Sequence, residues 1–208
     1  MKPIAHVVIG LCSVLAVCHA EPPSGPPPCC VEGCLEKPLS DKSLYHLESK
    51  WTTDDGKQIA LAALRGRPQV VVMFFASCEY ACPILVENLK AIERTLPAEV
   101  RGKAGFLLVS IDPDRDTPEA LRAYRAKHAF DAANWTLLHG GVDDIRELAA
   151  VLGIQYQRDS RGQFSHSNVI TVLDQDGVVA FQQAGLNKDP QETVTALIKT
   201  LGIPPTAP

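Results

Sequence analysis

The chain has 208 residues, a length typical of one domain. Hydrophobic residues make up 46% of it and charged residues 21%, proportions that argue against a disordered or fibrous chain. The formal net charge is −4, with 20 Lys and Arg against 24 Asp and Glu. The chain therefore has no excess of positive charge to neutralise phosphates, and we expect no nucleic-acid binding.

Residues 1–20 are typical of a signal peptide. Lys2 supplies a positive start, and the mostly apolar stretch over residues 4–17 is shorter than the roughly 17 to 25 residues of a membrane-spanning helix. Three fates stay open: cleavage after Ala20, retention as an uncleaved anchor, or lipidation at Cys18 within a sequence that resembles a lipobox. Each predicts a periplasmic or exported protein, which is membrane-anchored or lipidated if the leader or Cys18 is kept.

Residues 21–43 form a segment rich in proline and cysteine, which we expect to be flexible. Its cysteines are Cys29, Cys30 and Cys34. Two roles stay open for them: an auxiliary metal or redox cluster, or a local disulfide without catalytic use. Removal of the leader would leave five of the seven cysteines, and an odd number favours a thiol that is free, shared with a partner or bound to a metal.

The globular part begins near residue 44. Short strands are expected on both sides of Asp55-Gly56, a common hairpin signal. Beyond it, apolar β-branched runs alternate with segments whose apolar residues recur at helical spacing. In chain order we predict a buried strand at 69–75, a helix opened by Pro83, a buried strand at 106–111, a helix started by Thr117, a short strand, a helix over 145–152, hairpin strands at 169–173 and 178–181, and a last helix over 194–201.

This alternation predicts an α/β fold with a mostly parallel sheet flanked by helices and an added N-terminal hairpin. A thioredoxin-like domain fits the order, because its first buried strand delivers a cysteine motif onto a helix N-terminus. We expect the domain to span residues 44–202 and to be followed by a short tail over 203–208.

Cys78 and Cys82 come directly after the first buried strand, where α/β proteins place their chemistry. The N-terminus of the following helix would stabilise a thiolate. Residues four apart share a helix face, so the two sulfurs can converge on one metal or, after a modest adjustment, form a disulfide. A redox-active pair, a metal site and a buried structural disulfide all stay open.

His166 is the third candidate, because it lies just before the predicted strand at 169–173. In a thioredoxin-like sheet the loop that enters this strand lies beside the cysteine loop. Two thiolates and one imidazole make a soft, low-coordination site that suits copper, whereas zinc usually takes a fourth ligand. An isolated histidine at a strand start can equally be a surface or core residue.

Three segments together resemble the Sco family of copper chaperones, which serve cytochrome c oxidase assembly. They are FFASCEYACP, SIDPDRDTPEALRAY and FSHSNVITVLDQDG. The resemblance covers roughly residues 44–201 and implies a thioredoxin-like fold that binds one copper ion through Cys78, Cys82 and His166. One departure is Glu79-Tyr80-Ala81, where family members usually carry a Pro-Asp-like pair.

The sequence therefore predicts an exported metallochaperone that delivers copper to, or reduces the cysteines of, the copper site of a cytochrome c oxidase. The expected partners are the copper-site subunit of the oxidase or another cuproprotein, and a thiol reductant. One alternative is a periplasmic thiol–disulfide oxidoreductase with Cys78 as nucleophile and Cys82 as resolving thiol. Another is a copper buffer or sensor whose metal is held by Cys29, Cys30 and Cys34.

Asp116 is a further candidate at the end of the second buried strand. It could orient the metal loop or face a partner, or it could belong to the N-terminal cap of the helix that starts at Thr117.

Overall fold

The computed structural model describes residues 38–160 and 162–203. The predicted signal peptide (1–20), the cysteines at positions 29, 30 and 34, and nearly all of the predicted tail lie outside the described residues. Within the described part, no helix is long and apolar enough to cross a membrane.

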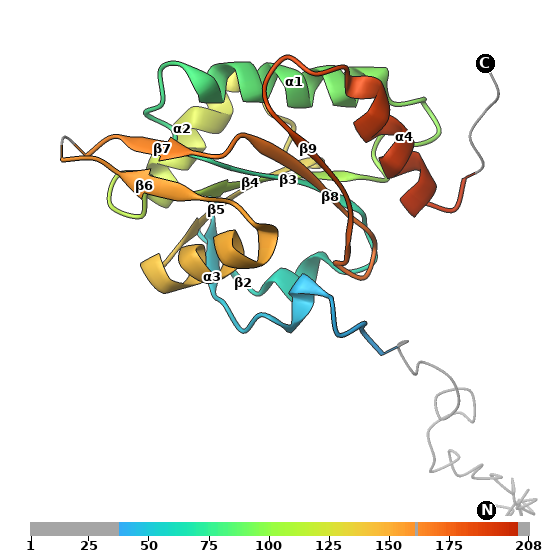
Figure 1. Cartoon of the computed structure of the whole chain (residues 1–208), viewed down its shortest axis with the longest axis horizontal. Coiled ribbons are helices and arrows are strands. Elements are labelled where there is room, and N and C mark those ends of the chain that lie inside the picture. Colours follow the sequence, from blue (N-terminus) through green and yellow to red (C-terminus); the bar gives the residue numbers. More distant parts are fainter. Residues whose placement is uncertain (1–37, 161, 204–208) are drawn as a thin grey trace, which may run out of the picture. The chain divides into compact units, whose positions relative to one another are not determined.

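Among residues 38–160 and 162–203, seven strands form the central sheet, and its three middle strands are parallel (Figure 1). Antiparallel strands extend the sheet on both sides. The spatial order is β2 (Gln58–Ile59), β1 (Trp51–Thr53), β5 (Trp135–Gly140), β4 (Gly105–Ser110), β3 (Gln69–Phe74), β8 (Val169–Leu173) and β9 (Val179–Ala184). The thioredoxin-like α/β prediction is confirmed, including the N-terminal hairpin β1–β2.

In the described part of the chain, four α-helices cover the sheet: α1 (Ala81–Thr95), α2 (Pro118–His128), α3 (Val142–Leu152) and α4 (Pro190–Thr200). Two short 3₁₀ helices, η2 (Leu44–His46) and η3 (Leu61–Leu64), flank the N-terminal hairpin. Local chemistry sets the starts of two helices, because Thr117 accepts from the amide of Ala120 and Asp189 from that of Gln191. Proline follows at the first helical position in both, where its missing N–H costs no hydrogen bond.

The helices lie in two layers. On one face are α1, α2 and α4, and on the other lies α3 (Figure 1). Phe74 of β3 contacts Tyr124 of α2 on the first face, with ring centroids 5.2 Å apart. Gln182 of β9 donates to the Leu152 carbonyl of α3 on the second. Because both faces are covered, β3 and β4 are buried at every position, as expected from their continuous apolar runs.

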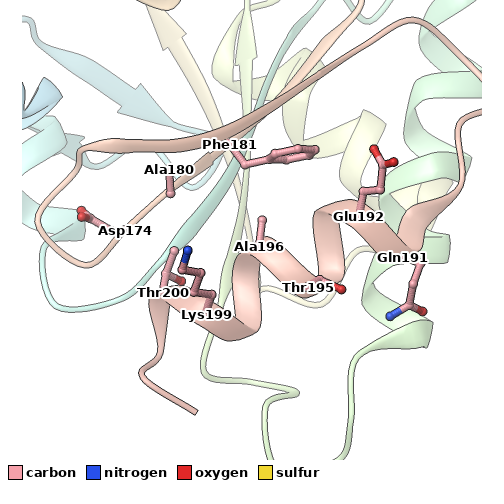
Figure 2. A pocket seen from close by; sticks show the side chains of 9 residues that line it. All are labelled: Asp174, Ala180, Phe181, Gln191, Glu192, Thr195, Ala196, Lys199 and Thr200. Carbon is pink, nitrogen blue, oxygen red and sulfur yellow. The ribbon is translucent and has the colours of Figure 1, made fainter. Parts of the chain in front are cut away.

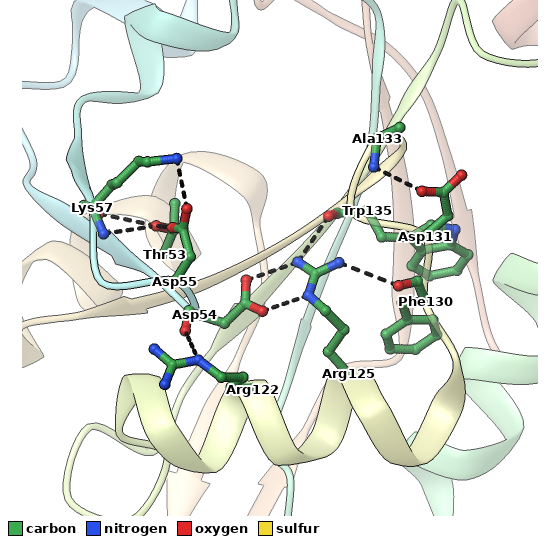
Figure 3. Close-up of polar contacts among 10 residues, drawn as sticks. All are labelled: Thr53, Asp54, Asp55, Lys57, Arg122, Arg125, Phe130, Asp131, Ala133 and Trp135. Atoms are coloured by element: carbon green, nitrogen blue, oxygen red, sulfur yellow. Dashed lines mark hydrogen bonds and ion pairs between the residues drawn. The ribbon is translucent and has the colours of Figure 1, made fainter.

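A buried ion pair fastens the N-terminal hairpin to α2 (Figure 3). Asp54 follows β1 directly, and its carboxylate accepts from Nε and Nη2 of Arg125, the latter at 2.7 Å. Arg125 also donates to the Trp135 carbonyl at 2.9 Å, and Arg122 donates to the Asp54 carbonyl at 3.0 Å. One arginine therefore joins the hairpin, α2 and β5.

The structure contains one further hairpin that the sequence pattern does not predict. It consists of β6 (Tyr156–Arg158) and β7 (Phe164–His166), which pair only with each other in a separate two-stranded sheet. None of their residues is fully buried, so they lack the apolar alternation that identifies a half-buried strand. His166 is the last residue of β7 as well as the residue that precedes the connection to β8.

Candidate metal centre

The two core cysteines lie at the junction between β3 and α1. Cys78 is in the connecting loop and half-buried, whereas Cys82 is in the first turn of α1 with 1% of its surface exposed. They are not joined by a disulfide. The amide of Cys82, which has no carbonyl partner within the helix, donates to Cys78 Sγ at 3.3 Å.

His166 reaches this junction from a distant part of the sequence. Strand β8 runs antiparallel to β3, with Gln69 opposite Leu173, so the start of β8 lies near the end of β3. The segment that leads into β8 brings His166 Nε2 to 3.6 Å from Cys82 Sγ. The structure thus brings together two of the three predicted ligands from positions 84 residues apart.

The imidazole of His166 is oriented for metal binding by its backbone. Its Nδ1 lies 3.1 Å from the carbonyl oxygen of Ser167. Because a carbonyl only accepts, this contact requires the proton on Nδ1 and leaves the Nε2 lone pair directed toward Cys82. The ring of Phe75 packs edge-on against the imidazole at 6.0 Å. The unprotonated ring nitrogen, Nε2, is therefore the one that faces Cys82 Sγ.

Burial keeps both contacting groups neutral. It raises the pKa of the Cys82 thiol well above its usual range, and the neighbouring Cys78 adds to this effect. It lowers the pKa of His166, an effect only partly offset by the hydrogen bond to Ser167. Near pH 7 the metal-free pair is a thiol beside a neutral imidazole, and a bound cation would have to displace the Cys82 proton.

We expect the two thiols to differ in reactivity. In the reduced protein at pH 7.5, iodoacetamide should alkylate Cys78 at least about tenfold faster than Cys82, because Cys82 is buried and its thiolate is disfavoured. Peptide mass mapping over time measures both rates. The difference should vanish in denaturant, and equal rates in the native protein would contradict this arrangement of the loop.

Asp116 connects the cysteine loop to the end of β4. Its carboxylate accepts from the amide of Ala76 at 2.9 Å and from the hydroxyl of Ser110 at 2.6 Å, and its residue is 2% exposed. The cap of α2 is instead Thr117, which accepts from the amide of Ala120. Asp116 therefore ties the loop to the end of β4. It does not cap α2, and it does not lie on the surface as a partner-facing residue would.

Two arginines attach the β6–β7 hairpin to the loop between β4 and α2. Arg115 Nη2 donates to the Gly162 carbonyl at 2.5 Å, and Arg158 Nη1 lies 2.7 Å from the carboxylate of Asp114. The guanidinium of Arg158 also lies over the ring of Phe164, 5.5 Å from its centroid. Sequence reasoning missed these contacts, which position the hairpin that carries the histidine.

The site is a surface junction and not a deep cavity. A cavity of about 540 Å³ adjoins His166 and is lined by residues 155–157 and 165–167. A larger groove of about 910 Å³ lies between β9 and α4, where Phe181, Glu192 and Lys199 line it (Figure 2). That groove contains no cysteine or histidine and takes no part in the site. As the side chains stand, no three His, Cys, Asp or Glu residues among 38–160 and 162–203 form a ready-made metal cluster.

Comparison with known families identifies the domain. The sequence model of the family described as SCO1/SenC matches residues 40–202. The chain belongs to the SCO1/SenC family. This match includes Cys78, Cys82 and His166, and it confirms the family resemblance of the three sequence segments.

Solved Sco structures share the fold. A SCO1/SenC family lipoprotein from Bacillus anthracis is 27% identical, with a TM-score of 0.68 over 74% of this chain and 94% of that one. ScoI from Bradyrhizobium japonicum, solved with copper bound, is 22% identical, with a TM-score of 0.62 over 73% and 96%. A third structure is that of BsSco, a member of the Sco family of cytochrome c oxidase assembly proteins in which a disulfide switch was identified. It is 22% identical, with a TM-score of 0.65 over 74% of this chain and 92% of that one.

Proposed function

We propose that this SCO1/SenC domain is an exported metallochaperone that binds one copper ion through Cys78, Cys82 and His166. The proposed acceptor is the copper site of a cytochrome c oxidase. The observation that carries the proposal is the 3.6 Å contact between Cys82 Sγ and His166 Nε2. Copper-bound ScoI and the description of BsSco as an oxidase assembly protein support the choice of metal and of partner.

The donor set fits Cu(I). Two soft sulfur ligands and one neutral imidazole match the preference of this ion for low coordination by thiolate and imidazole. The imidazole already carries its proton on the nitrogen away from the sulfurs. Closure of the site requires both thiols to lose their protons, and the amide of Cys82, which donates to Cys78 Sγ, would stabilise the thiolate formed there.

Copper loading and thiol oxidation exclude each other in this proposal. A disulfide between Cys78 and Cys82 would remove both sulfur ligands, so only the reduced pair can hold the ion. The same pair supports a second function, reduction of the cysteines of the acceptor. The half-buried Cys78 suits the attacking thiol and the buried Cys82 suits the resolving one.

Copper stoichiometry and ligand identity test the proposed function directly. We expect the reduced full-length protein to bind one Cu(I) at the core site, with X-ray absorption giving two sulfur ligands and one imidazole nitrogen. A variant lacking residues 21–34 should keep this ion, and any copper bound by Cys29, Cys30 and Cys34 would be counted as the difference. Complete loss of copper binding in the shortened variant would contradict the core site and favour a buffer based on the N-terminal cysteines.

A further inference from the structure

Apolar side chains are exposed beside the two cysteines. Tyr80 lies between Cys78 and Cys82 and is 83% exposed. Ile84, one helical turn further along, is 37% exposed, and Pro83 between them is also exposed. Glu79 precedes Tyr80 in the loop and Glu87 follows Ile84 by three residues on α1, and both are exposed. We name these five residues the Tyr80 patch.

Tyr80 stands out among the exposed hydrophobic side chains of the described residues. The large hydrophobic side chains exposed among residues 38–160 and 162–203 are Tyr80, Ile84, Val142, Val151 and Val179, and Tyr80 is the most exposed of them. Tyr45 and Tyr124, by contrast, are buried in the core. Single exposed apolar residues are ordinary, so it is the position of Tyr80 and Ile84, next to the cysteine loop, that indicates an interaction surface.

The accessibility of the ligands sets the side from which an acceptor can approach. Cys82 is buried in α1, and His166 is covered on one side by Phe75. Cys78 is flanked in the loop by Ser77 and Glu79, which are both exposed. Copper that moves by ligand exchange requires acceptor atoms to reach the ion while the donor ligands still hold it. An acceptor protein that reaches Cys78 must therefore contact the cysteine loop, on which Tyr80 lies.

We propose that the Tyr80 patch is the docking surface for the protein that accepts copper. This inference rests on the proposed function and names the contact through which it acts. The acceptor presents its own copper ligands next to an apolar surface that covers Tyr80 and Ile84, with a basic residue facing Glu79. Each copper–ligand bond made to the acceptor replaces one made to Cys78, Cys82 or His166, and protons released by acceptor thiols return to the donor thiolates. No oxidant or reductant is needed.

The test compares a protein acceptor with a small one. Copper-loaded wild-type protein and Tyr80→Ala are mixed either with the copper-free soluble domain that carries the copper site of a cytochrome c oxidase or with the Cu(I) chelator bicinchoninate. We expect Tyr80→Ala to slow transfer to the domain at least about tenfold and to weaken the complex similarly, as loss of an interface anchor does. Transfer to bicinchoninate should not change, because a small chelator needs no docking surface.

Matched variants separate docking from effects on the fold. Val151→Ala removes a side chain of 50% exposure on α3 and should leave both transfers unchanged. Ile84→Ser should slow transfer to the domain without affecting the chelator. The dissociation constant of each complex, measured by biolayer interferometry with the reduced copper-free protein, gives a readout that does not depend on copper.

Each other outcome overturns a defined part of the proposal. Equal slowing of both transfers by Tyr80→Ala would mean that Tyr80 acts on the metal loop and not on docking. Unchanged transfer to the domain, with unchanged complex affinity, would eliminate the Tyr80 patch as the docking surface and leave the proposed function intact. A wild-type protein that loads no copper would contradict the proposed function, and one that passes copper to bicinchoninate but not to the domain would contradict both the oxidase acceptor and the docking surface.

Discussion

Replacement of His166 by alanine is expected to lower Cu(I) affinity more than about 100-fold. Removing a residue that only orients a metal ligand already lowers metal affinity about 10- to 100-fold. His166 supplies the nitrogen that lies 3.6 Å from Cys82 Sγ, so its removal takes away a ligand outright. Competition titration against a Cu(I) chelator of known affinity measures the change, and Cys82→Ser should have an effect at least as large.

The control for this substitution is another histidine. His46→Ala removes an exposed imidazole whose Nε2 lies 3.0 Å from the carbonyl oxygen of Ser40, and it should leave copper affinity unchanged. Circular dichroism should give the same folded spectrum for both variants. Wild-type copper affinity in His166→Ala would eliminate the three-ligand site. Full disulfide reductase activity in the same variant would then favour the oxidoreductase, which does not need the imidazole.

The parts of the fold with strong hydrophobic patterns could be predicted from the sequence. The run over Gln69–Phe74 is buried at all six positions because helices cover both faces of β3. The Asp55-Gly56 signal marks the β1–β2 hairpin, where Gly56 adopts φ +89°, a left-handed conformation that suits glycine. The apolar run and the Asp-Gly turn signal each lie within a few consecutive residues, so a local pattern is enough to identify them.

The meeting of Cys82 with His166 could be anticipated only through topology. It depends on the antiparallel pairing of β3 with β8, which no local pattern specifies. The β6–β7 hairpin escaped prediction because its stability comes from side-chain contacts to other loops, such as that of Arg158 with Asp114. The exposure of Tyr80 could not be predicted either, because a tyrosine beside a helix start can point inward or outward without any change in the sequence pattern.

The site is consequently supported by parts of the chain that are distant in sequence. Asp116 fastens the start of the cysteine loop to β4, and the two residues before it, Asp114 and Arg115, fasten the hairpin that carries His166. The loop between β4 and α2 therefore contacts both the cysteine loop and the hairpin that carries His166. Through these contacts, a short hairpin outside the main sheet is held against the same loop that supports the cysteines.

Loss of the Arg125 guanidinium is expected to produce the largest change in stability. Arg125→Met leaves the Asp54 carboxylate, which is 7% exposed, without its buried partner, and it also removes the hydrogen bond to the Trp135 carbonyl (Figure 3). Breaking one side of a buried pair typically costs about 3 to 5 kcal/mol, because the remaining charge stays desolvated. For a chain of this size the thermal midpoint should fall by roughly 6 to 20 °C, measured by circular dichroism.

Two variants test whether the uncompensated charge is the cause. Adding Asp54→Asn to Arg125→Met removes the buried charge and should recover part of the lost stability, so that the double variant unfolds above the single one. Lys57→Met breaks the exposed pair with Asp55, whose side chains are 77% and 53% exposed, and should leave the thermal midpoint close to that of the wild type. An Arg125→Met protein as stable as Lys57→Met would contradict the role of the Asp54–Arg125 pair. The hairpin would then be held to α2 chiefly by its apolar contacts, with Trp51 fully buried against Gly140 of β5.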